Sequence, residues 1–567
     1  MRDDGAVVAQ EVIDGVWQEL ARTPFVALEL GGAPSLPDLS FEATAARAAL
    51  ARRLLAMAAE VDDASLTPEL ALTLDVARHR ASMWERAEAW YWLVQDPLGV
   101  GFYAMFAPTA YSGAYLLGML RPLFARHPLG QADEEAAYLA LVEDVGHLVD
   151  QFHDRTVGQW ERGIVMPRAQ LDQAVPLMAR LRRSMAALVA LPDESAQGSA
   201  LGQRVDRILA GRIEPAFDRL IGLLEDPRYR DAAPGAVGLA QYPGGAQLYR
   251  ELVVLHTTFD LDPEAVHRIG EKRMARVEEQ MQSLLERIGF KGTPHAYLAA
   301  VASDPAWRRD SAEELSDFFR RYIERIAPEI PIHFNFRPKA GHDVAALPEA
   351  QSGSMTFGFY DPPKPGQPQG LYRFNAQNLA GAPLANVAAL NFHELVPGHH
   401  FHIASQRENA SLHPLRQHSF VNAFNEAWAE YAATFAGEIG MYQAPEEQFG
   451  RLMMDAFLTC RLVVDTGMNA LGWSLEDGRA YLRSKGFMNE AEVASESVRY
   501  SCDLPAQSLA YKLGDDFLVE TREVMRKELG PRFDVRDFHD AVLSGGAMPL
   551  PMVAANVRRA TARLAAG

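Results

Sequence analysis

The sequence contains few cysteines and no long apolar run. Cys460 and Cys502 are the two cysteines among 567 residues, so no disulfide framework is expected. No run of eighteen apolar residues occurs, which predicts no membrane-spanning helix. The opening residues, M-R-D-D-G-A-V-V-A-Q-E-V, are charged and lack the apolar core of a secretory signal. Together these absences predict a cytoplasmic protein without a membrane partner.

Positive charge is also scarce. Lys and Arg number 55 against 74 Asp and Glu, which gives a formal net charge of −19 at pH 7. Phosphate backbones and anionic lipids repel such a chain, so nucleic acid and membrane surfaces are excluded as expected partners. Apolar residues make up 48%, which is typical of a globular protein, and the length allows two or more domains. The sequence does not indicate an oligomeric state.

Most of the chain has helical apolar spacing, without internal repeats or low-complexity tracts, and we expect a mainly α fold. Proline and glycine accumulate between residues 231 and 245. This favours an N-terminal helical region over 1–235 and a catalytic region over 236–567, unless the two form one intertwined unit. A small β-sheet is expected at about 332–375. Its predicted strands are short, aromatic and alternating: Ile332–Phe336, Met355–Tyr360 and Leu371–Phe374.

The histidines are most concentrated after residue 390, but this stretch lacks the helical zinc motif H-E-x-x-H. Residues 391–402 read N-F-H-E-L-V-P-G-H-H-F-H, and six of the sixteen histidines lie between 393 and 418. Zinc hydrolases need two or three imidazoles, usually a carboxylate ligand, and a second carboxylate as base. In H-E-x-x-H the two histidines are four apart and share one helix face. Here the position four after His393 is Pro397.

A regular helix cannot bring a second histidine to His393. At ~100° per residue, His399 would lie about 240° around the helix, and His400 would lie about 10 Å along its axis. Pro397 has no N–H for the His393 carbonyl, and Gly398 tolerates an irregular backbone, so the helix is expected to be distorted there. A two-residue distortion would bring His399 to the usual place of the second ligand. We prefer His399 as ligand, with His400 as the alternative.

A third ligand is expected from a second helix over 423–440. Its acids Glu426, Glu430 and Glu438 can share a broad face. Glu426 is the best ligand candidate, because Trp428 and Tyr431 flank its turn and indicate a buried start. The zinc-site helices are therefore expected over about 385–440. The histidines left as supporting or surface residues are His402, His413 and His418.

The remaining candidates follow from the needs of hydrolysis. Glu394 adjoins the first ligand and is the expected general base. A tetrahedral oxyanion needs a donor, for which we choose Tyr511, with Arg499 or Tyr500 as contacts to the oxyanion or a substrate carboxylate. Asp465, on an apolar helix, is a candidate to orient a liganding histidine.

Substrate binding is expected beside the predicted sheet. A strand edge near Met355–Phe359 can hold an extended peptide by strand addition. The substrate-binding candidates are Tyr360, Tyr500 and His400.

These residues resemble the bacterial family catalogued as domain of unknown function 885, whose hallmarks are H-E-x-x-P-G-H-H and a downstream E-G-W-x-x-Y. Further landmarks cover roughly residues 130 to 567 and include R-G-I-V-M-P-R at 162–168, D-T-G at 465–467 and Y-K-L-G at 511–514. The resemblance implies a mainly helical, gluzincin-like metallopeptidase. Its ligands carry over to His393, His399 and Glu426, and its base to Glu394.

The chain departs from the family pattern at three positions. Ala427 and Ala506 replace the usual glycines, and Asn469 replaces a usual histidine after D-T-G. None removes a proposed ligand or the base, but Asn469 can alter substrate handling.

The sequence therefore predicts a zinc-dependent hydrolase that acts on a peptide or small-molecule amide, with one Zn²⁺ per chain. Other divalent ions also suit a His/Glu site. Two alternatives stay open: a metal-dependent lyase or cyclase acting on a specialised metabolite, and a helical binding protein with a degenerate metal site.

Overall fold

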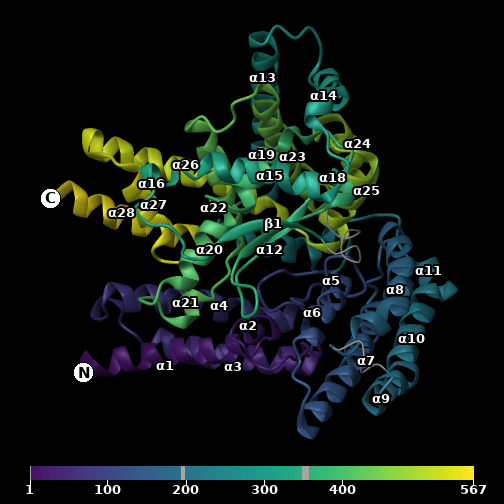
Figure 1. The fold of residues 1–567 in the computed structure, drawn as a ribbon. Helices are drawn as coiled ribbons and strands as arrows, with labels where there is room; N and C mark the ends of the chain where they lie inside the picture. Colours follow the sequence, from purple (N-terminus) through teal and green to yellow (C-terminus); the bar gives the residue numbers. More distant parts are fainter. Residues whose placement is uncertain (1, 193–197, 348–356, 567) are drawn as a thin grey trace. The chain divides into compact units, whose positions relative to one another are not determined.

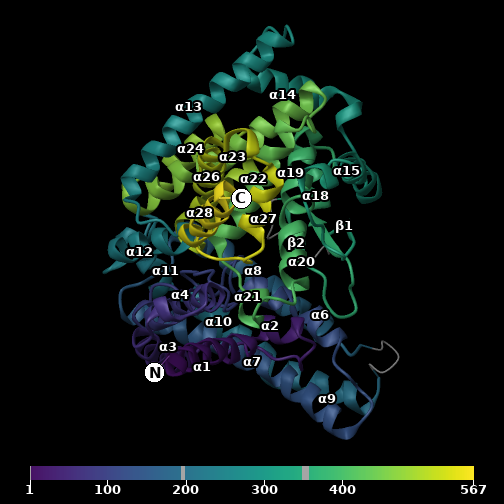
Figure 2. The ribbon, with the colours of Figure 1, turned by 90° about the vertical axis from the view of Figure 1, so that its left-hand side faces the viewer.

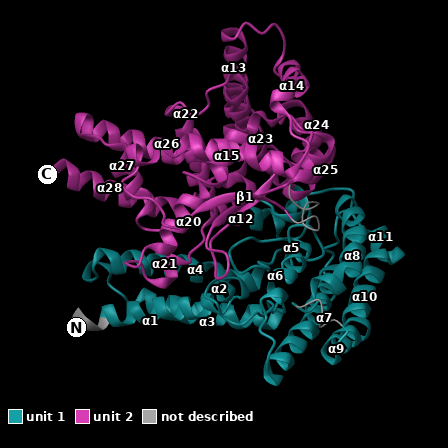
Figure 3. Cartoon of the chain, viewed as in Figure 1, with its two compact units in different colours: residues 1–249, 501–505 teal, residues 250–500, 506–567 magenta. Residues whose placement is uncertain are grey.

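The computed structural model describes residues 2–192, 198–347 and 357–566 (Figure 1). The chain is mainly helical, with one small sheet, as the sequence predicted. It divides into two compact units (Figure 3). Unit 1 comprises 1–249 and 501–505, and unit 2 comprises 250–500 and 506–567. Within the described ranges, none of the helices combines the length and apolar character needed to cross a bilayer.

Unit 1 consists of helices and the turns between them. The longest, α7, begins with three acidic residues in its first turn, where the helix dipole favours negative charge. A π-helical turn at Leu209–Ile213 joins α9 to α10. The helices are α1 (Arg2–Ala21), α2 (Pro24–Glu29), α3 (Phe41–Ala59), α4 (Pro68–Trp90), α5 (Gly113–Gly118), α6 (Leu120–Ala125), α7 (Ala132–Glu161), α8 (Arg168–Leu188), α9 (Ala200–Ile208), α10 (Glu214–Glu225) and α11 (Pro227–Ala232).

Unit 2 carries the sheet and the remaining helices. The division between the units falls within α12 (Gly245–Thr257). The other helices are α13 (Pro263–Arg287), α14 (Pro294–Ser303), α15 (Ala312–Ile326), α16 (Ile330–His333), α18 (Ala376–Leu379), α19 (Val387–Glu394), α20 (His399–Glu408), α21 (Pro414–Gln417), α22 (Asn422–Glu438), α23 (Pro445–Ala470), α24 (Leu475–Lys485), α25 (Glu490–Val498), α26 (Ala510–Leu529), α27 (Val535–Leu543) and α28 (Leu550–Ala566).

Small residues allow the central helices of unit 2 to approach closely. α13 packs on α23, where a Cβ at Gly270 would lie 2.7 Å from a methyl carbon of Val463. α22 packs on α26, where a Cβ at Gly514 would lie 2.3 Å from that of Ala427. These contacts, together with the apolar faces of α23, form the core on which α19 packs.

The sheet has the order β1-β3-β2, with β1 (His342–Ala346) parallel and β2 (Gly358–Asp361) antiparallel to β3 (Gly370–Phe374). Tyr360 on β2 pairs with Tyr372 on β3. β1 packs on α15 and β3 on α20, and Figure 2 shows the strands next to these helices.

The strand predictions are partly confirmed. β3 matches the third predicted strand, and β2 lies at the end of the second, of which Met355 and Thr356 fall outside the described residues. The first prediction was wrong. Residues 330–333 form a turn of helix, because Pro331 is pre-set for a first helical turn. The first strand is β1, which begins at His342.

Candidate metal centre

The histidine-rich stretch forms two helices with a break between them. α19 ends at Glu394 and α20 begins at His399. The Val396–Pro397 peptide bond between them is cis, and the indole Nε1 of Trp428 donates to the Pro397 carbonyl at 2.8 Å. The sequence predicted a distortion within one helix. The structure shows a complete interruption, since Pro397 cannot donate to the preceding turn.

Gly398 allows the chain to turn back tightly after the break. A Cβ there would lie 1.8 Å from the carbonyl oxygen of His393. The φ angle of Gly398 is −79°, so the position requires glycine for this close approach rather than for a left-handed backbone. As a result, the imidazole of His399 lies against that of His393, with ring centres 4.8 Å apart.

Three potential ligand atoms converge at this point. Nε2 of His393 lies 3.6 Å from Oε2 of Glu426, and Nε2 of His399 lies 3.5 Å from the same oxygen. All three atoms lie within 4.8 Å of one another. Ligands bound at about 2 Å around a tetrahedral metal are separated by about 3–4 Å, so the spacing fits a zinc-sized ion.

The protonation of His393 supports the same fit. Its Nδ1 contacts Oε1 of Glu430 at 2.9 Å. A carboxylate only accepts, so Nδ1 holds a proton, and Nε2 is the ring nitrogen directed toward Glu426. Oε2 of Glu426 is buried and has no hydrogen-bond donor among the described residues. A buried carboxylate oxygen in this position is stabilised by a nearby cation.

Two buried cations hold Glu430 in place. Its Oε2 accepts from Nζ of Lys512 at 3.1 Å and from the guanidinium of Arg451 at 3.2 Å. Lys512 is 0% exposed and also contacts two acids, Asp455 and Asp515. Opposite charges in this dry environment keep Glu430 ionised, and Glu430 in turn fixes the ring orientation of His393. The sequence assigned Glu430 only to the helix face, without this role.

The pKa shifts follow from these contacts. Burial lowers the pKa of His393, but Glu426 and Glu430 outweigh it and raise that pKa to about 10. Burial raises the pKa of Glu426, but the two imidazoles outweigh it and hold the pKa far below its ordinary value. For Glu430, Arg451 and Lys512 outweigh burial and also lower the pKa. The centre therefore keeps the carboxyl groups of Glu426 and Glu430 ionised.

Glu394 lies at the end of α19, next to the ligand set. It is buried, and burial raises the pKa of its carboxyl, with a smaller contribution from Glu426; His393 and His399 oppose the shift. The backbone N–H of Tyr360 donates to the Glu394 carboxylate. The edge of β2 therefore faces the predicted general base.

His400 lies apart from the ligand set. Its Nδ1 contacts the hydroxyl of Tyr360 at 2.9 Å, and its Nε2 contacts the carbonyl of Ala340 at 3.1 Å. Both ring nitrogens of His400 therefore contact Tyr360 and Ala340 rather than Glu426. Among the other histidines, Nε2 of His402 lies 3.5 Å from Nδ1 of His399, and His413 caps α21.

Tyr511 is the predicted oxyanion donor that lies closest to the ligands. Its ring is nearly parallel to that of His393, with centres 6.2 Å apart. Burial and then Glu426 raise the pKa of its hydroxyl, so it stays protonated at neutral pH. Arg499 donates to Gln507 at 2.9 Å, whereas Tyr500 is fully buried and its hydroxyl contacts Glu496.

Asp465 contacts the turn before α26. Its carboxylate accepts from the backbone N–H of Ala506 at 3.0 Å and from the hydroxyl of Ser508 at 2.8 Å. It therefore anchors this turn, and Glu430 is the acid that contacts the imidazole of His393.

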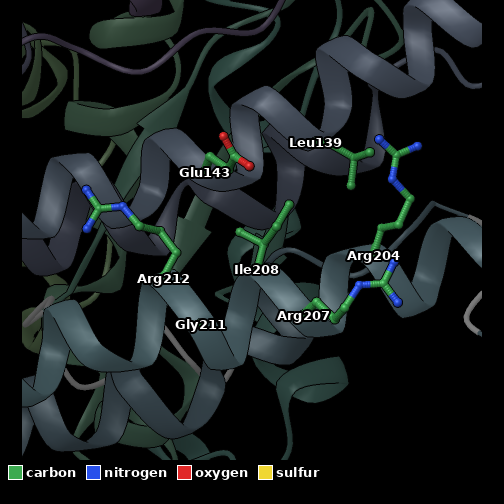
Figure 4. Close-up of a pocket in the computed structure, with 7 residues that line it drawn as sticks. All are labelled: Leu139, Glu143, Arg204, Arg207, Ile208, Gly211 and Arg212. Carbon is green, nitrogen blue, oxygen red and sulfur yellow. The ribbon is translucent and has the colours of Figure 1, made fainter.

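A separate pocket of about 360 Å³ lies in unit 1 between α7 and the α9 region (Figure 4). It is lined by Leu139, Glu143, Arg204, Arg207, Ile208, Gly211 and Arg212. Three guanidinium groups and one carboxylate line this pocket and offer no metal-ligand set.

Comparison with known proteins identifies the family. The model of a family described as "bacterial protein of unknown function (DUF885)" matches residues 24–557. The chain belongs to this family. Among solved structures, a "putative lipoprotein" from Colwellia psychrerythraea shares the fold, with a TM-score of 0.80, 22% identity and 99% of each chain covered. A "putative lipoprotein of unknown function" from Shewanella oneidensis has a TM-score of 0.70 and 17% identity, over 97% of this chain and 99% of that one. No curated protein matches the chain.

The three residues expected to depart from the family pattern are Ala427, Ala506 and Asn469. Ala427 packs against Gly514, and Ala506 adopts a left-handed φ of 66°, which glycine would relieve. Asn469 is fully buried and donates to the Tyr500 carbonyl at 2.9 Å and to Asp465. It therefore supports the backbone around the DUF885 motifs.

Proposed function

We propose that the protein is a zinc-dependent hydrolase, a metallopeptidase of gluzincin-like architecture that cleaves a peptide or peptide-like amide. His393, His399 and Glu426 would hold the metal. The observation that carries the proposal is the buried, donor-free Oε2 of Glu426, which faces two imidazole nitrogens while a second carboxylate, Glu394, adjoins the first ligand.

The chemistry follows from the residues around that set. When bound, zinc supplies Lewis acidity that polarises a carbonyl and acidifies water. Glu394 takes one proton from the water as the water oxygen bonds to the carbonyl carbon. Glu394 then passes the proton to the amide nitrogen as the C–N bond breaks. The products are a carboxylic acid and an amine, so atoms and electrons balance.

Other residues prepare this reaction. Tyr511 keeps its hydroxyl proton because burial raises its pKa, and it can donate to the developing oxyanion. Glu430 holds the His393 ring through Nδ1, which leaves Nε2 as the nitrogen that faces the metal position. Tyr360 holds Glu394 through a backbone N–H, which limits the directions in which the carboxylate can point.

The test compares wild type with Glu394→Gln, which keeps the size of the side chain and removes the base. We expect about one zinc per chain in both proteins and a 10²–10⁴-fold lower kcat on a peptide library for the variant. Glu438→Gln, on α22 but outside the ligand set, is the control and should retain turnover. Full turnover by Glu394→Gln would overturn the assignment.

Products separate hydrolysis from the lyase or cyclase alternative. In ¹⁸O-labelled water, hydrolysis places one labelled oxygen in the new carboxylate. Turnover without incorporated label supports the alternative chemistry, and zinc binding without any turnover supports a binding protein.

A further inference from the structure

Two arginines form a cluster behind Tyr511. The arginine cluster comprises Arg461, Glu496, Arg499, Tyr500 and Tyr511, all in unit 2. The guanidinium carbon of Arg461 lies 4.7 Å from the ring centre of Tyr511. Tyr511 stacks in turn near the imidazole of His393, with ring centres 6.2 Å apart. The guanidinium of Arg461 is therefore at most about 11 Å from the ring of the first metal ligand.

The two guanidinium groups share one carboxylate. Glu496 Oε2 contacts Nη2 of Arg461 at 3.4 Å, and Glu496 Oε1 lies 3.6 Å from Nη1 of Arg499. Arg461 also donates from Nε to the Tyr500 hydroxyl at 2.8 Å. Both arginines lie close enough to lower the pKa of Tyr511, against the larger effect of burial.

Arg461 has an edge available for a further carboxylate. Its hydrogen bonds use Nε and Nη2, and in the described part of the chain no acceptor pairs with Nη1. The guanidinium is held flat by Phe457 and Tyr511, whose ring centres lie 4.6 and 4.7 Å from its central carbon. A guanidinium fixed in this way is pre-organised for a carboxylate, since few of its rotamers remain to be lost on binding.

The distance limits what a substrate can place there. A metal–nitrogen bond takes about 2 Å, and one extended residue spans about 3.3–3.6 Å. The guanidinium of Arg461 and the ring of His393 are at most about 11 Å apart, and a guanidinium–carboxylate contact takes up part of that distance. One or two residues therefore fit between a carbonyl at the metal ligands and a carboxylate at the cluster. A long chain that continues beyond the cleaved bond would place an uncharged amide against two cations.

We propose that the arginine cluster binds the free C-terminal carboxylate of the substrate, so that the enzyme removes one or two residues from the C-terminal end of a peptide. This inference rests on the proposed hydrolase function and names its substrate class. Arg499 and Arg461 are the specificity-determining residues, Glu496 positions both, and Tyr511 separates the carboxylate from the cleaved bond.

The test measures equilibrium binding as well as cleavage. A panel of N-acetylated dipeptides, each as free acid and as C-terminal amide, is titrated calorimetrically into zinc-loaded Glu394→Gln protein. We expect the acids to bind at least tenfold more tightly than the matched amides. Adding Arg499→Gln or Arg461→Gln should reduce that acid-to-amide ratio to near one, and Arg499→Lys should leave an intermediate ratio. Arg479→Gln is the control, because Arg479 donates to Ser497 beside the cluster and belongs to α24.

Each outcome decides the proposal. If the Glu394→Gln protein binds acids and amides with equal affinity, or binds neither, the proposed carboxylate site is overturned. This outcome does not depend on any variant of the arginine cluster. An acid preference that persists in both arginine variants also overturns it. Cleavage of acids and amides at equal kcat/KM leaves the hydrolase standing and removes the carboxylate site. Arginine-dependent acid binding without cleavage supports the carboxylate site and removes the hydrolase.

Discussion

Metal content should distinguish the adjacent histidines His399 and His400. We expect His399→Ala to lose the roughly one zinc per chain expected in wild type, because its Nε2 faces Glu426. His400→Gln should keep that zinc, since both ring nitrogens of His400 contact other groups. Elemental mass spectrometry of protein purified without a histidine tag measures both. The opposite pattern would exchange the two assignments.

The choice between these two histidines could not be settled from spacing, because it depends on the path of four non-helical residues. The types and spacing of His393, Glu394 and the later carboxylates indicate metal chemistry, and the structure brings His393, His399 and Glu426 within 4.8 Å. The roles of Glu430 and Arg461 were missed for a similar reason, since they arise from which helix faces which.

Glu430→Gln should weaken metal binding without removing a ligand. The neutral amide no longer fixes the Nδ1 proton of His393, and loss of such a supporting partner lowers metal affinity by about 10–100-fold. Competition with a fluorescent zinc chelator measures the change. Glu438→Gln on the same helix should leave zinc affinity unchanged, because Glu438 pairs with Arg522 instead. Equal affinities in the two variants would remove the positioning role of Glu430.

Elements were predicted well where one strong pattern governed them and poorly where two signals competed. Helical spacing predicted the mainly α architecture, and a short alternating aromatic run predicted the last strand. At residues 332–336 alternating apolar residues favoured a strand, yet Pro331 began a helical turn and left Ile332 57% exposed. The break between α19 and α20 was underestimated, because proline predicts a disturbance but tertiary contacts such as Trp428 with Pro397 determine its extent.

Gly398→Ala should disrupt the break between α19 and α20. The added methyl would overlap the His393 carbonyl, so the backbone must move and the histidines separate. We expect lower thermal stability and loss of zinc, measured by calorimetry and elemental analysis. Gly222→Ala, in α10 with open space around its Cβ, should instead raise stability by about 0.5–1 kcal/mol. Normal zinc content in Gly398→Ala would show that the break tolerates a side chain.

At the scale of the whole molecule, buried neutral histidines control acid stability. His539 is fully buried, with Nδ1 on the His333 carbonyl at 2.9 Å and Nε2 on the Tyr431 hydroxyl at 3.0 Å. Burial lowers its pKa to about 3. The unfolded chain takes up this proton near pH 6.5 and the folded chain does not. The resulting stability is complete above pH 6.5 and declines as the pH falls toward 3.

The free energy of unfolding, measured as the pH is lowered, tests this account. Between pH 6.5 and 4.5, His539 alone should lower the free energy of unfolding by about 2–3 kcal/mol. His539→Gln can keep both hydrogen bonds without titrating, so its unfolding free energy should fall less steeply over that range. Denaturant unfolding at several pH values measures the slope. A slope for His539→Gln equal to that of wild type would contradict this account.

The short segment 501–505 has a consequence for how this protein can be divided or recombined. These five residues belong to unit 1, although the chain on both sides of them belongs to unit 2. Within unit 1, Asp503 is buried and accepts from the Thr109 hydroxyl and the Tyr111 backbone. A gene cut after residue 249 would therefore separate Asp503 from these donors. Each unit is compact, but unit 1 is not encoded by one continuous stretch of the gene. Exchange of unit 1 between relatives should therefore succeed only when residues 501–505 are exchanged together with residues 1–249.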